Sequence, residues 1–512
     1  MKAVKQPFTF NRRSCGVLMH ITSLPGRHGS GDLGRAAYDF VDFLSAAGQR
    51  WWQMLPVNPP GDGFSPYSCN STFAGSPWLI SLDQLVKEGL LRKSELLPST
   101  AFRDAKLIFQ AVVPYRAERL RVAYERFKYK SGANAALNRF IRKHSGWLDD
   151  FALFSALQEA HGGKPWNLWA RDLRLHEPSA LADARRVLAD EVRFHQFQQY
   201  IFDKQWSALK AYANKKGVGL IGDIPIFIAY DSADVWARRD LFVLDREGAP
   251  RVVSGCPPDF FNADGQRWGH PHYDWRRHQQ EGFAWWVKRF AETLRLFDGV
   301  RIDHFLGFYR TWQIPADQLT ARVGKWVKTP GRELFTAVRK RLGQPPIIAE
   351  DLGAVTVGAS RLRDEFGFPS MKVLQFGFGG GCDHMPHNQS AASVFYTGTH
   401  DNDTIRGYFD KVETAGRRSR KARAEFALMQ RYANTNGDGT NMHWDLIRTV
   451  MASRAHTAIF PVQDILGLGG EARMNVPGTV VDNWEWRMKP GALKKEHAAM
   501  LRTMCEDFER VQ

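Results

Sequence analysis

Cysteine is scarce in this chain of 512 residues: there are five, at positions 15, 69, 256, 382 and 505. Their number is odd, they lie far apart, and no C-x-x-C pair or His-paired metal spacing occurs. Disulfide frameworks and zinc sites have such patterns, so the sequence predicts free thiols. H-x-x-x-H, facial-triad and EF-hand patterns are also missing, so no metal or other cofactor is expected.

Long apolar runs are missing too. No stretch approaches 18 uninterrupted apolar residues, and residues 1–15 lack the apolar core of a secretory signal. A membrane span is therefore not expected, and the default expectation is a cytoplasmic protein. Apolar residues are nevertheless plentiful, at 44% with 12% aromatic, which excludes disordered, collagenous and coiled-coil classes and predicts a globular protein.

The net charge of +16 is unevenly distributed. Residues 101–143 carry eleven Lys or Arg against three Asp or Glu, and residues 417–423 hold a compact basic run. Both segments have helix-like sequence. Because no helix-turn-helix, zinc-finger or RRM signature accompanies them, a solvated helical face is favoured over a nucleic-acid site. Neither a nucleic acid nor a membrane is expected as a partner, and the oligomeric state stays open.

Eight short runs rich in Val, Ile and Leu recur along the chain, most of them bounded by Gly or Pro and ending on a polar residue. They are 16–20, 51–55, 219–223, 299–303, 346–350, 371–375, 394–400 and 458–462. Helix-like segments, such as 35–47, 192–215, 283–296 and 332–341, separate most of them. Alternation of strand and helix indicates a parallel sheet, and eight units predict an α/β protein with a (β/α)8 TIM barrel.

The length alone would allow three or four domains, but the eight units favour a single catalytic barrel spanning residues 1–512. Their uneven spacing requires large insertions. We expect a mainly helical insertion at about 60–195, an aromatic region of loops and short strands at 228–275, and a third insertion at 305–332.

In such barrels the active face lies at the C-terminal strand ends, where this sequence has its polar residues. Period-two alternation directs Arg301 and Asp303 to the barrel interior. There the guanidinium would keep the carboxylate ionised, as a nucleophile or electrostatic stabiliser requires. A purely structural ion pair is the alternative.

The apolar approach to Glu350 would desolvate this carboxyl and raise its pKa toward that of a general acid. Asp351 should face the other way, and the competing interpretation is that the two acids cap a helix introduced by Leu352 and Gly353. His400 and Asp401 end the seventh strand. Three carboxylates on strands four, five and seven fit glycoside chemistry, in which an acid and a nucleophile flank the scissile bond.

Aromatic residues gather where a sugar ring could stack, although most Trp residues in proteins belong to the core. The candidates are Tyr67, Phe260, Phe261, Trp268, Tyr273 and Trp275. The segment 256–275 is polar and rich in Gly and Pro, which favours a binding role for its aromatic residues.

Taken together, these motifs resemble one family, the 4-alpha-glucanotransferases called amylomaltases or disproportionating enzymes, glycoside hydrolase family 77. The resemblance extends from about Gly16 to Arg487. The motifs, in order, are Leu24-Pro-Gly, Gly31-Asp-Leu-Gly, Trp52-Gln-Met-Leu-Pro, Ser65-Pro-Tyr, Gly222-Asp-Ile-Pro-Ile, Cys256-Pro-Pro-Asp, Gly265-Gln, Arg301-Ile-Asp-His, Ala349-Glu-Asp-Leu-Gly, His400-Asp-Asn-Asp-Thr and Arg473-Met-Asn-Val-Pro-Gly.

The resemblance implies that Asp303 is the nucleophile, Glu350 the acid/base and Asp401 the stabiliser of the transition state. It implies that Arg301, His304 and His400 surround the glucosyl unit being transferred. The substrate contacts that it implies are Asp223, Trp268, Gln266, Tyr67, Ser65 and Asn475. The sequence departs from the common pattern at 262–264, at His270 and at Thr329, which leaves the chemistry intact but puts chain-length preference in doubt.

The family acts on alpha-1,4-glucans and malto-oligosaccharides by a retaining route, and it lacks a separate C-terminal β-domain. The resemblance thus implies transfer of a glucan segment to the 4-hydroxyl of an acceptor glucan or glucose through a covalent intermediate. Two alternatives stay open, an α-amylase-like hydrolase with the same three carboxylates and a carbohydrate-binding scaffold without catalysis. The presence of all three carboxylates argues against the scaffold.

Overall fold

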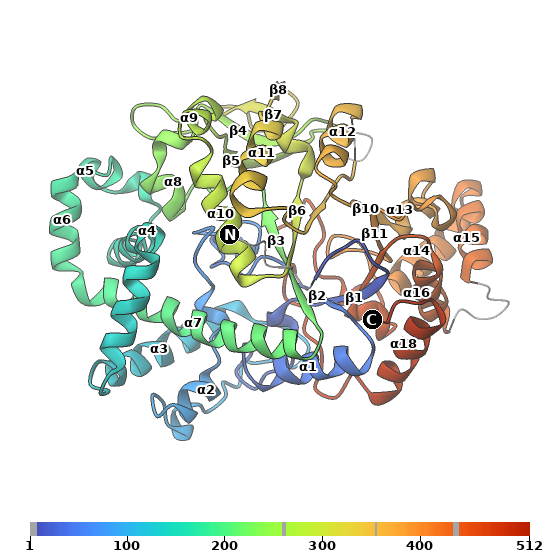
Figure 1. The fold of residues 1–512 in the computed structure, drawn as a ribbon, viewed down its shortest axis with the longest axis horizontal. Helices are drawn as coiled ribbons and strands as arrows, with labels where there is room; N and C mark the ends of the chain where they lie inside the picture. Colours follow the sequence, from blue (N-terminus) through green and yellow to red (C-terminus); the bar gives the residue numbers. More distant parts are fainter. Residues whose placement is uncertain (1–7, 259–262, 354–355, 434–439, 512) are drawn as a thin grey trace.

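Eight parallel strands close into a barrel in the computed structural model, which describes residues 8–258, 263–353, 356–433 and 440–511. Around the barrel the order is β1-β12-β11-β10-β9-β6-β3-β2. The strands are β1 (Ser14–Leu18), β2 (Trp51–Gln53), β3 (Gly219–Pro225), β6 (Gly299–Asp303), β9 (Ile347–Ala349), β10 (Ser370–Val373), β11 (Ser393–Tyr396) and β12 (Thr457–Pro461). Each overlaps one predicted apolar run, so the predicted barrel is confirmed (Figure 1).

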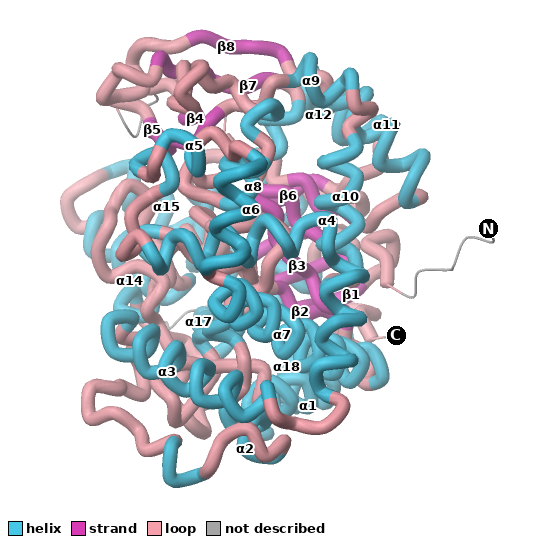
Figure 2. The backbone as a smooth tube through the Cα atoms, turned by 90° about the vertical axis from the view of Figure 1, so that its left-hand side faces the viewer, coloured by secondary structure: helices cyan, strands magenta, loops and turns pink. Residues whose placement is uncertain are grey.

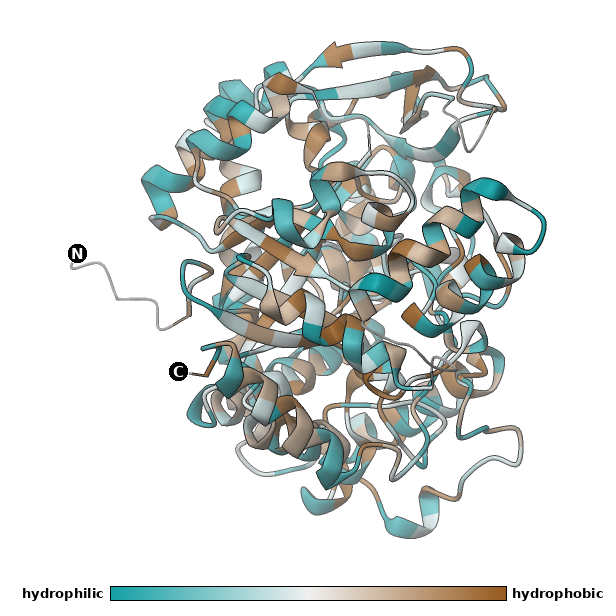
Figure 3. Ribbon diagram, turned by 90° about the vertical axis from the view of Figure 1, so that its right-hand side faces the viewer, coloured by the Kyte–Doolittle hydropathy of each residue, from teal (hydrophilic) through white to brown (hydrophobic). Residues whose placement is uncertain are grey.

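Helices surround the barrel. They are α1 (Arg35–Ala46), α2 (Leu82–Lys87), α3 (Phe109–Lys128), α4 (Ala133–Ala160), α5 (Arg171–Arg174), α6 (Pro178–Val187), α7 (Ala189–Lys215), α8 (Ala233–Ala237), α9 (Trp275–Gln280), α10 (Ala284–Leu296), α11 (Gly331–Leu342), α12 (Val357–Glu365), α13 (Leu374–Phe378), α14 (Ile405–Gly416), α15 (Arg420–Ala433), α16 (Met442–Ala452), α17 (Val462–Ile465) and α18 (Lys495–Asp507). In α1 the buried residues are Ala37, Phe40, Val41 and Leu44, the spacing of one helical face. Figure 3 shows the result, with hydrophobic strands in the middle and hydrophilic residues on the helices around them.

The barrel interior is a packed core rather than a pore. Side chains from successive strands meet there, among them Leu18, Trp51, Ile221, Ile348, Val394 and Ile459. Phe8 and Phe10 close the N-terminal end of the barrel, because the ring of Phe10 stacks on Trp51 with centroids 4.7 Å apart. Only the opposite end, where the strands terminate in polar residues, is left open for chemistry.

The two ends of the chain are joined where the barrel closes. β1 pairs with β12 over its full length, from Ser14 opposite Thr457 to Leu18 opposite Pro461. Arg510, which is fully buried, donates hydrogen bonds to five backbone carbonyls, one of them on Ser14 of β1 and the others between Met451 and His456. A single side chain thus ties the C-terminal segment to the first strand.

Two insertions shape the open end. The first, between β2 and β3, contains helices α2 to α6 and forms the helical lobe on the left of Figure 1. The second insertion, in two parts, forms a four-stranded antiparallel sheet in the order β5-β4-β7-β8, which lies at the top of Figure 2. Its strands are β4 (Val252–Cys256), β5 (Gln266–Pro271), β7 (Arg310–Pro315) and β8 (Lys325–Lys328). Because β4 pairs with β7, this sheet joins the segments before and after β6.

The basic segments lie mainly on helices, the first on α3 and α4 and the second around the start of α15. Several cations of the first segment pair with acids, such as Arg126 with Glu95 at 2.5 Å and Lys128 with Glu125 at 2.7 Å. No disulfide bond joins any of the five cysteines, all of which lie in the described residues, as predicted. In the described residues, no helix combines the length and apolar character needed to cross a bilayer. The same residues contain no group of three or more His, Cys, Asp or Glu side chains that could hold a metal ion.

Candidate active site

A cleft of about 790 Å³ opens at the C-terminal ends of the barrel strands. Most residues predicted for the site line it, from six different parts of the chain. They are Ser65, Tyr67, Gln266, Trp268, Arg301, Asp303, His304, Glu350, His400, Asp401 and Asn475. The exception is Asp223, which lies behind the cleft wall. The cleft is therefore where the chemistry of these residues has to be examined.

Arg301 connects two carboxylates at the base of the cleft. Its Nη2 lies 3.0 Å from Oδ1 of Asp303, whose side chain is 30% exposed to the cleft. Its Nη1 donates to both oxygens of Asp223, at 2.7 and 2.9 Å. Burial opposes the charge on Arg301, but the two carboxylates outweigh burial and raise the pKa of the guanidinium. A permanent cation thus lies beside Asp303 and fixes the position of this carboxylate.

Asp223 differs from the prediction of a direct substrate contact. Its carboxylate has no exposed surface, because Arg301 covers one side and Tyr67 the other. The Tyr67 hydroxyl donates to Oδ2 of Asp223 at 2.7 Å. Asp223 thus orients the two side chains that do face the cleft. The hydrogen bond between Tyr67 and Asp223 joins the loop after β2 to the end of β3. The spacing of the two residues along the sequence does not predict it.

Glu350 follows directly after β9, on the strand next to β6. Ile302 pairs with Ala349, so Asp303 and Glu350 occupy the next position of the same register. Neighbouring strands lie about 4.8 Å apart. Retaining glycosidases hold their two carboxyl groups about 5 to 5.5 Å apart. The register of the barrel therefore places the two carboxyl groups at the ends of adjacent strands.

The backbone holds the Glu350 carboxyl in place. His304 has a left-handed conformation with φ of 50°, and its N–H donates to Oε2 of Glu350 at 2.7 Å. Leu352 donates its N–H to Oε1 at 3.2 Å. Burial raises the pKa of Glu350 to about 8, with Arg301 opposing and the charge of Asp303 adding to the rise. The carboxyl is thus protonated at neutral pH, as a general acid must be.

The competing helix-cap interpretation of Glu350 and Asp351 is wrong. Helix α12 begins at Val357, and the Thr356 hydroxyl caps it by accepting from the N–H of Ala359. Asp351 faces away from the cleft, as expected, where its carboxylate accepts from the N–H of Met371 and pairs with Arg363.

Asp401 is held by three neighbours and remains 43% exposed. Its Oδ1 accepts from the Asn475 amide at 2.6 Å, and its Oδ2 lies 3.3 Å from Nε2 of His400. Arg473 donates to the backbone carbonyl of Asp401 at 2.5 Å. Because the carboxylate is both fixed and accessible, it can accept hydrogen bonds from sugar hydroxyls.

The imidazoles of the cleft are uncharged at neutral pH. Burial lowers the pKa of His304 and of His400, although the nearby carboxylates Asp303 and Asp401 oppose this effect. A neutral imidazole offers one donor and one acceptor. The ring of His400 also stacks on Tyr67, with centroids 5.0 Å apart, so its orientation is fixed.

The predicted aromatic residues have three different outcomes. Trp268 lines the cleft, and its ring contacts His304 edge-on with centroids 4.9 Å apart. Tyr273 belongs to the core instead, because its hydroxyl donates to the carbonyl of Ile226 and the side chain is buried. Trp275 begins α9 and stacks on Trp286, away from the cleft. The predicted Phe260 and Phe261 lie outside the described residues.

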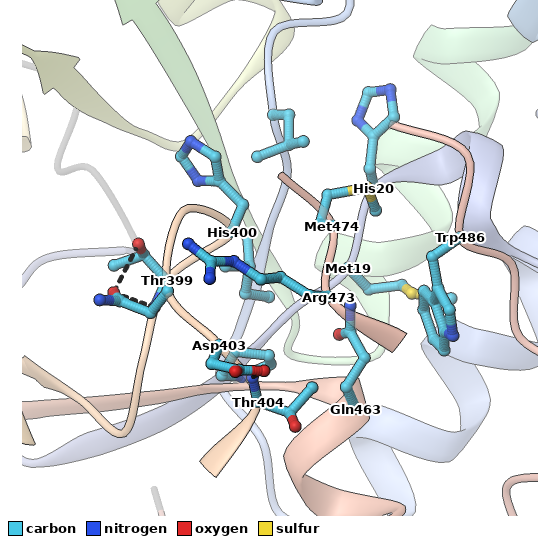
Figure 4. A pocket seen from close by; sticks show the side chains of 14 residues that line it. Met19, His20, Thr399, His400, Asp403, Thr404, Gln463, Arg473, Met474 and Trp486 are labelled. Carbon is cyan, nitrogen blue, oxygen red and sulfur yellow. Dashed lines mark hydrogen bonds between the residues drawn. The ribbon is translucent and has the colours of Figure 1, made fainter. Parts of the chain in front are cut away.

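The sequence analysis missed several cleft residues, among them Trp484, Phe376 and Arg473. Trp484 packs against Tyr67 and His400, and Phe376 is 40% exposed at the cleft. Arg473 stands in a motif that was recognised, but it was not assigned to the site. Figure 4 shows Arg473 beside His400 in a small cavity next to the cleft, which Met19, His20 and Trp486 also line. Trp484 and Phe376 are single aromatic residues without a periodic pattern around them. The sequence therefore contained no indication that they line the cleft.

Comparisons with known proteins agree with this geometry. Residues 19–494 match the model of a family described as 4-alpha-glucanotransferase. A 4-alpha-glucanotransferase from Thermus thermophilus is 46% identical, covering 98% of this chain and 99% of that protein. One from Synechocystis sp. is 45% identical, covering 98% of each. An amylomaltase from Streptococcus agalactiae, solved in complex with acarbose, superposes with a TM-score of 0.93 at 38% identity, covering 98% of this chain and 100% of that chain.

Proposed function

The chain belongs to the 4-alpha-glucanotransferase family and catalyses glucan transfer, and from this premise we propose that Asp303 and Glu350 carry out a retaining double displacement. The proposal rests on one observation: the two carboxyl groups lie at the ends of neighbouring strands but in different surroundings. Asp303 lies against a permanent cation, whereas burial keeps Glu350 protonated. A carboxylate paired with a cation beside a buried, protonated carboxyl is typical of a nucleophile and an acid.

In the first step, a carboxylate oxygen of Asp303 attacks C1 of the donor glucosyl unit. The bond from C1 to the bridging oxygen breaks, and that oxygen takes the proton of Glu350 and leaves with the reducing-end fragment. Arg301, held on its other side by Asp223, fixes the attacking carboxylate. Asp401, fixed by Asn475, accepts hydrogen bonds from the sugar hydroxyls as positive charge develops at C1.

In the second step, the ionised Glu350 takes the proton from the 4-hydroxyl of an acceptor, whose oxygen attacks C1 and releases Asp303. We propose alpha-1,4-glucans and malto-oligosaccharides as donors and acceptors, which the resemblance to an amylomaltase solved with acarbose supports. Water competes for the same intermediate. Transfer exceeds hydrolysis only where the acceptor sugar is bound, a role that we assign to Trp268, Gln266 and Tyr67.

Incubation with maltotriose tests the proposed reaction. Transfer yields glucose together with a ladder of longer oligosaccharides, because each glycosyl unit released from one chain is added to another. An amylase-like hydrolase yields shortened products only. Product masses over time separate the two outcomes, and a ladder that never forms would reject the transferase.

The pH dependence of kcat/KM tests whether Glu350 acts as the acid. Because Glu350 must be protonated in the first step and its pKa is about 8, kcat/KM should fall as pH rises through about 8. The decline should disappear with a maltosyl fluoride donor, since fluoride leaves without a proton. Initial rates between pH 6 and 10 with both donors provide the measurement. An identical decline with both donors would assign it to another group.

Replacing Trp268 with Ala should lower transfer about 3- to 10-fold more than hydrolysis, because stacking favours a sugar over water. The melting temperature should change little, since the ring lines the cleft and is only partly buried. The ratio of reducing ends formed to bonds exchanged gives the readout. A core residue would instead cost about 3 to 5 kcal/mol on truncation. A large stability loss with an unchanged ratio would rule out the platform.

A further inference from the structure

The loop of residues 397–404 joins β11 to α14 and carries two cleft residues, His400 and Asp401. A small cavity of about 20 Å³, next to the cleft, lies against this loop (Figure 4). The loop residues that line it are Thr399, His400, Asn402, Asp403 and Thr404. Close packing fixes side chains in a protein interior, and it is interrupted where a cavity lies. The position of Asp401 therefore depends strongly on the bonds at the two ends of the loop.

Asp464 bonds to both ends of this loop. It belongs to α17, which follows directly after β12. Its Oδ2 accepts from the hydroxyl of Thr397, the first loop residue, at 2.5 Å. Its Oδ1 accepts from the N–H of Ile405, the first residue of α14, at 2.8 Å. Because β11 and β12 are neighbouring strands, one carboxylate after the second strand closes the loop that leaves the first.

Asp464 lies outside the cleft and is buried, with 1% of its surface exposed. A carboxylate in such surroundings costs free energy unless hydrogen bonds compensate for the lost water. Within the described residues, the hydrogen-bond partners of this side chain are the two loop ends. The stability of this buried charge is therefore tied to the shape of the loop.

In the described residues, one other charge acts on Asp464. Asp403, on the same loop, faces it and is itself paired with Lys411 of α14. β12 has no charged residue, and the buried residues of α16 are all apolar. Burial, with the Asp403 charge adding, raises the pKa of Asp464 to about 6, although both bonds from the loop oppose the rise. The carboxylate therefore predominates at pH 7 and becomes protonated as the pH falls through about 6.

We infer that Asp464 is a positioning residue for the transfer reaction, because it fixes the loop that holds Asp401 against the transferred glucosyl unit. It acts through Asp401 and does not touch the substrate itself. The inference rests on the proposed function, since it takes Asp401 as the group that stabilises this sugar. It makes the accuracy of the site depend on a side chain behind the cleft wall.

Asp464→Asn tests the inference, because an amide offers one acceptor oxygen where the carboxylate offers two. One end of the loop thus loses its bond. A catalytic group displaced by about 1 Å loses up to about 100-fold in rate, so kcat at pH 7 should fall about 10- to 100-fold. KM should change little, since the other contacts of the cleft remain. The loss should be equal with maltotriose and maltosyl fluoride, because Asp401 contacts the glucosyl unit that both donors share.

The pH profile separates positioning from a purely structural role. For the wild-type enzyme kcat/KM should decline as pH falls through about 6, whereas Asp464→Asn, which resembles the protonated carboxyl, should lack this decline. Thr397→Val removes a donor that lowers the pKa of Asp464, so the decline should move to a higher pH. Thr397→Ser keeps the hydroxyl and should restore the wild-type profile. The two Thr397 variants give the same information if Asp464→Asn does not fold.

Asp298→Asn is the matched control. This mostly buried carboxylate also joins two segments, because it accepts from the N–H of Leu220 and from the amide of Asn214. It lies just before β6, at the opposite end of the barrel from the cleft. The change should leave kcat at pH 7 and the pH profile at their wild-type values.

A double variant connects Asp464 to Asp401. Because coupled residues are not additive, adding Asp464→Asn to Asp401→Asn should reduce kcat little further. A full additional loss would overturn the inference. Wild-type kcat in Asp464→Asn, or a decline near pH 6 that persists in this variant, would overturn it too. Normal turnover by Asp401→Asn would instead show that the role proposed for Asp401 fails, and the inference would fall with it.

Discussion

Asp303→Asn should reduce kcat by about three orders of magnitude or more while the enzyme still folds and binds glucan. The amide is nearly the same size as the carboxylate, but it cannot form the bond to C1. Its partner Arg301 remains anchored by Asp223 at 2.7 and 2.9 Å, so the cleft should keep its shape. Single-turnover mass spectrometry of the wild-type enzyme with maltosyl fluoride should detect a glycosylated peptide that contains Asp303.

The matched control is Asp317→Asn, the same change at an exposed position outside the cleft. It should retain wild-type kcat. Binding of maltotriose to Asp303→Asn, measured by calorimetry, should persist, which separates loss of chemistry from loss of the site. Near-normal turnover by Asp303→Asn would reject this residue as the nucleophile.

Glu350→Gln should lower kcat/KM for maltotriose by about 10²- to 10⁴-fold, because the leaving oxygen no longer receives a proton. With maltosyl fluoride the first step needs no acid, so it should proceed at close to the wild-type rate. The second step still lacks its base. The covalent intermediate should therefore accumulate, giving a burst of one fluoride ion per enzyme followed by slow turnover.

Fluoride release followed over milliseconds to minutes measures both phases. An added anionic nucleophile that needs no deprotonation, such as azide, should speed the slow phase in Glu350→Gln and leave the wild-type enzyme little changed. Equal losses with maltotriose and the fluoride, without a burst, would remove Glu350 from the acid/base role.

The sequence predicted the barrel strands well because each is a short apolar run that the fold buries. The strand ends were less accurate. The seventh run was expected to continue to His400, but β11 ends at Tyr396. The following threonines form the turn instead, since the Thr397 and Thr399 hydroxyls bond to Asp464 and Asn402. One of these partners, Asp464, lies 67 positions along the chain, so the sequence around the strand does not show where it stops.

The four-stranded sheet over the cleft was harder to foresee. Its outer strand, β8, reads Lys-Trp-Val-Lys, which is too short and too polar to indicate a strand. It forms because Trp312 of β7 pairs with Trp326. The same limit applies to aromatic residues: Trp268 and Tyr273 stand in one polar segment, yet the first lines the cleft and the second packs into the core.

Carboxylate roles were more predictable than substrate contacts. Two local features of the sequence locate these residues. Period-two alternation identifies Arg301 and Asp303, and the run of apolar residues before Glu350 identifies that carboxyl. Asp223 shows where such reasoning ends, because its burial depends on Tyr67, a residue 156 positions earlier in the chain. Trp484 illustrates the same point, since at the cleft it packs on Tyr67 and His400, both distant in sequence.

The clamp formed by Arg510 has a consequence for synthesis on the ribosome. β1 is translated well before its partner β12 and the guanidinium that holds Ser14. A nascent chain can therefore assemble the intermediate strands while one edge of β1 stays unpaired, a state that invites association with other chains. Barrel closure must wait until β12 and Arg510 have been translated. Arg510→Ala should thus impair folding yield more than the same change at an exposed arginine.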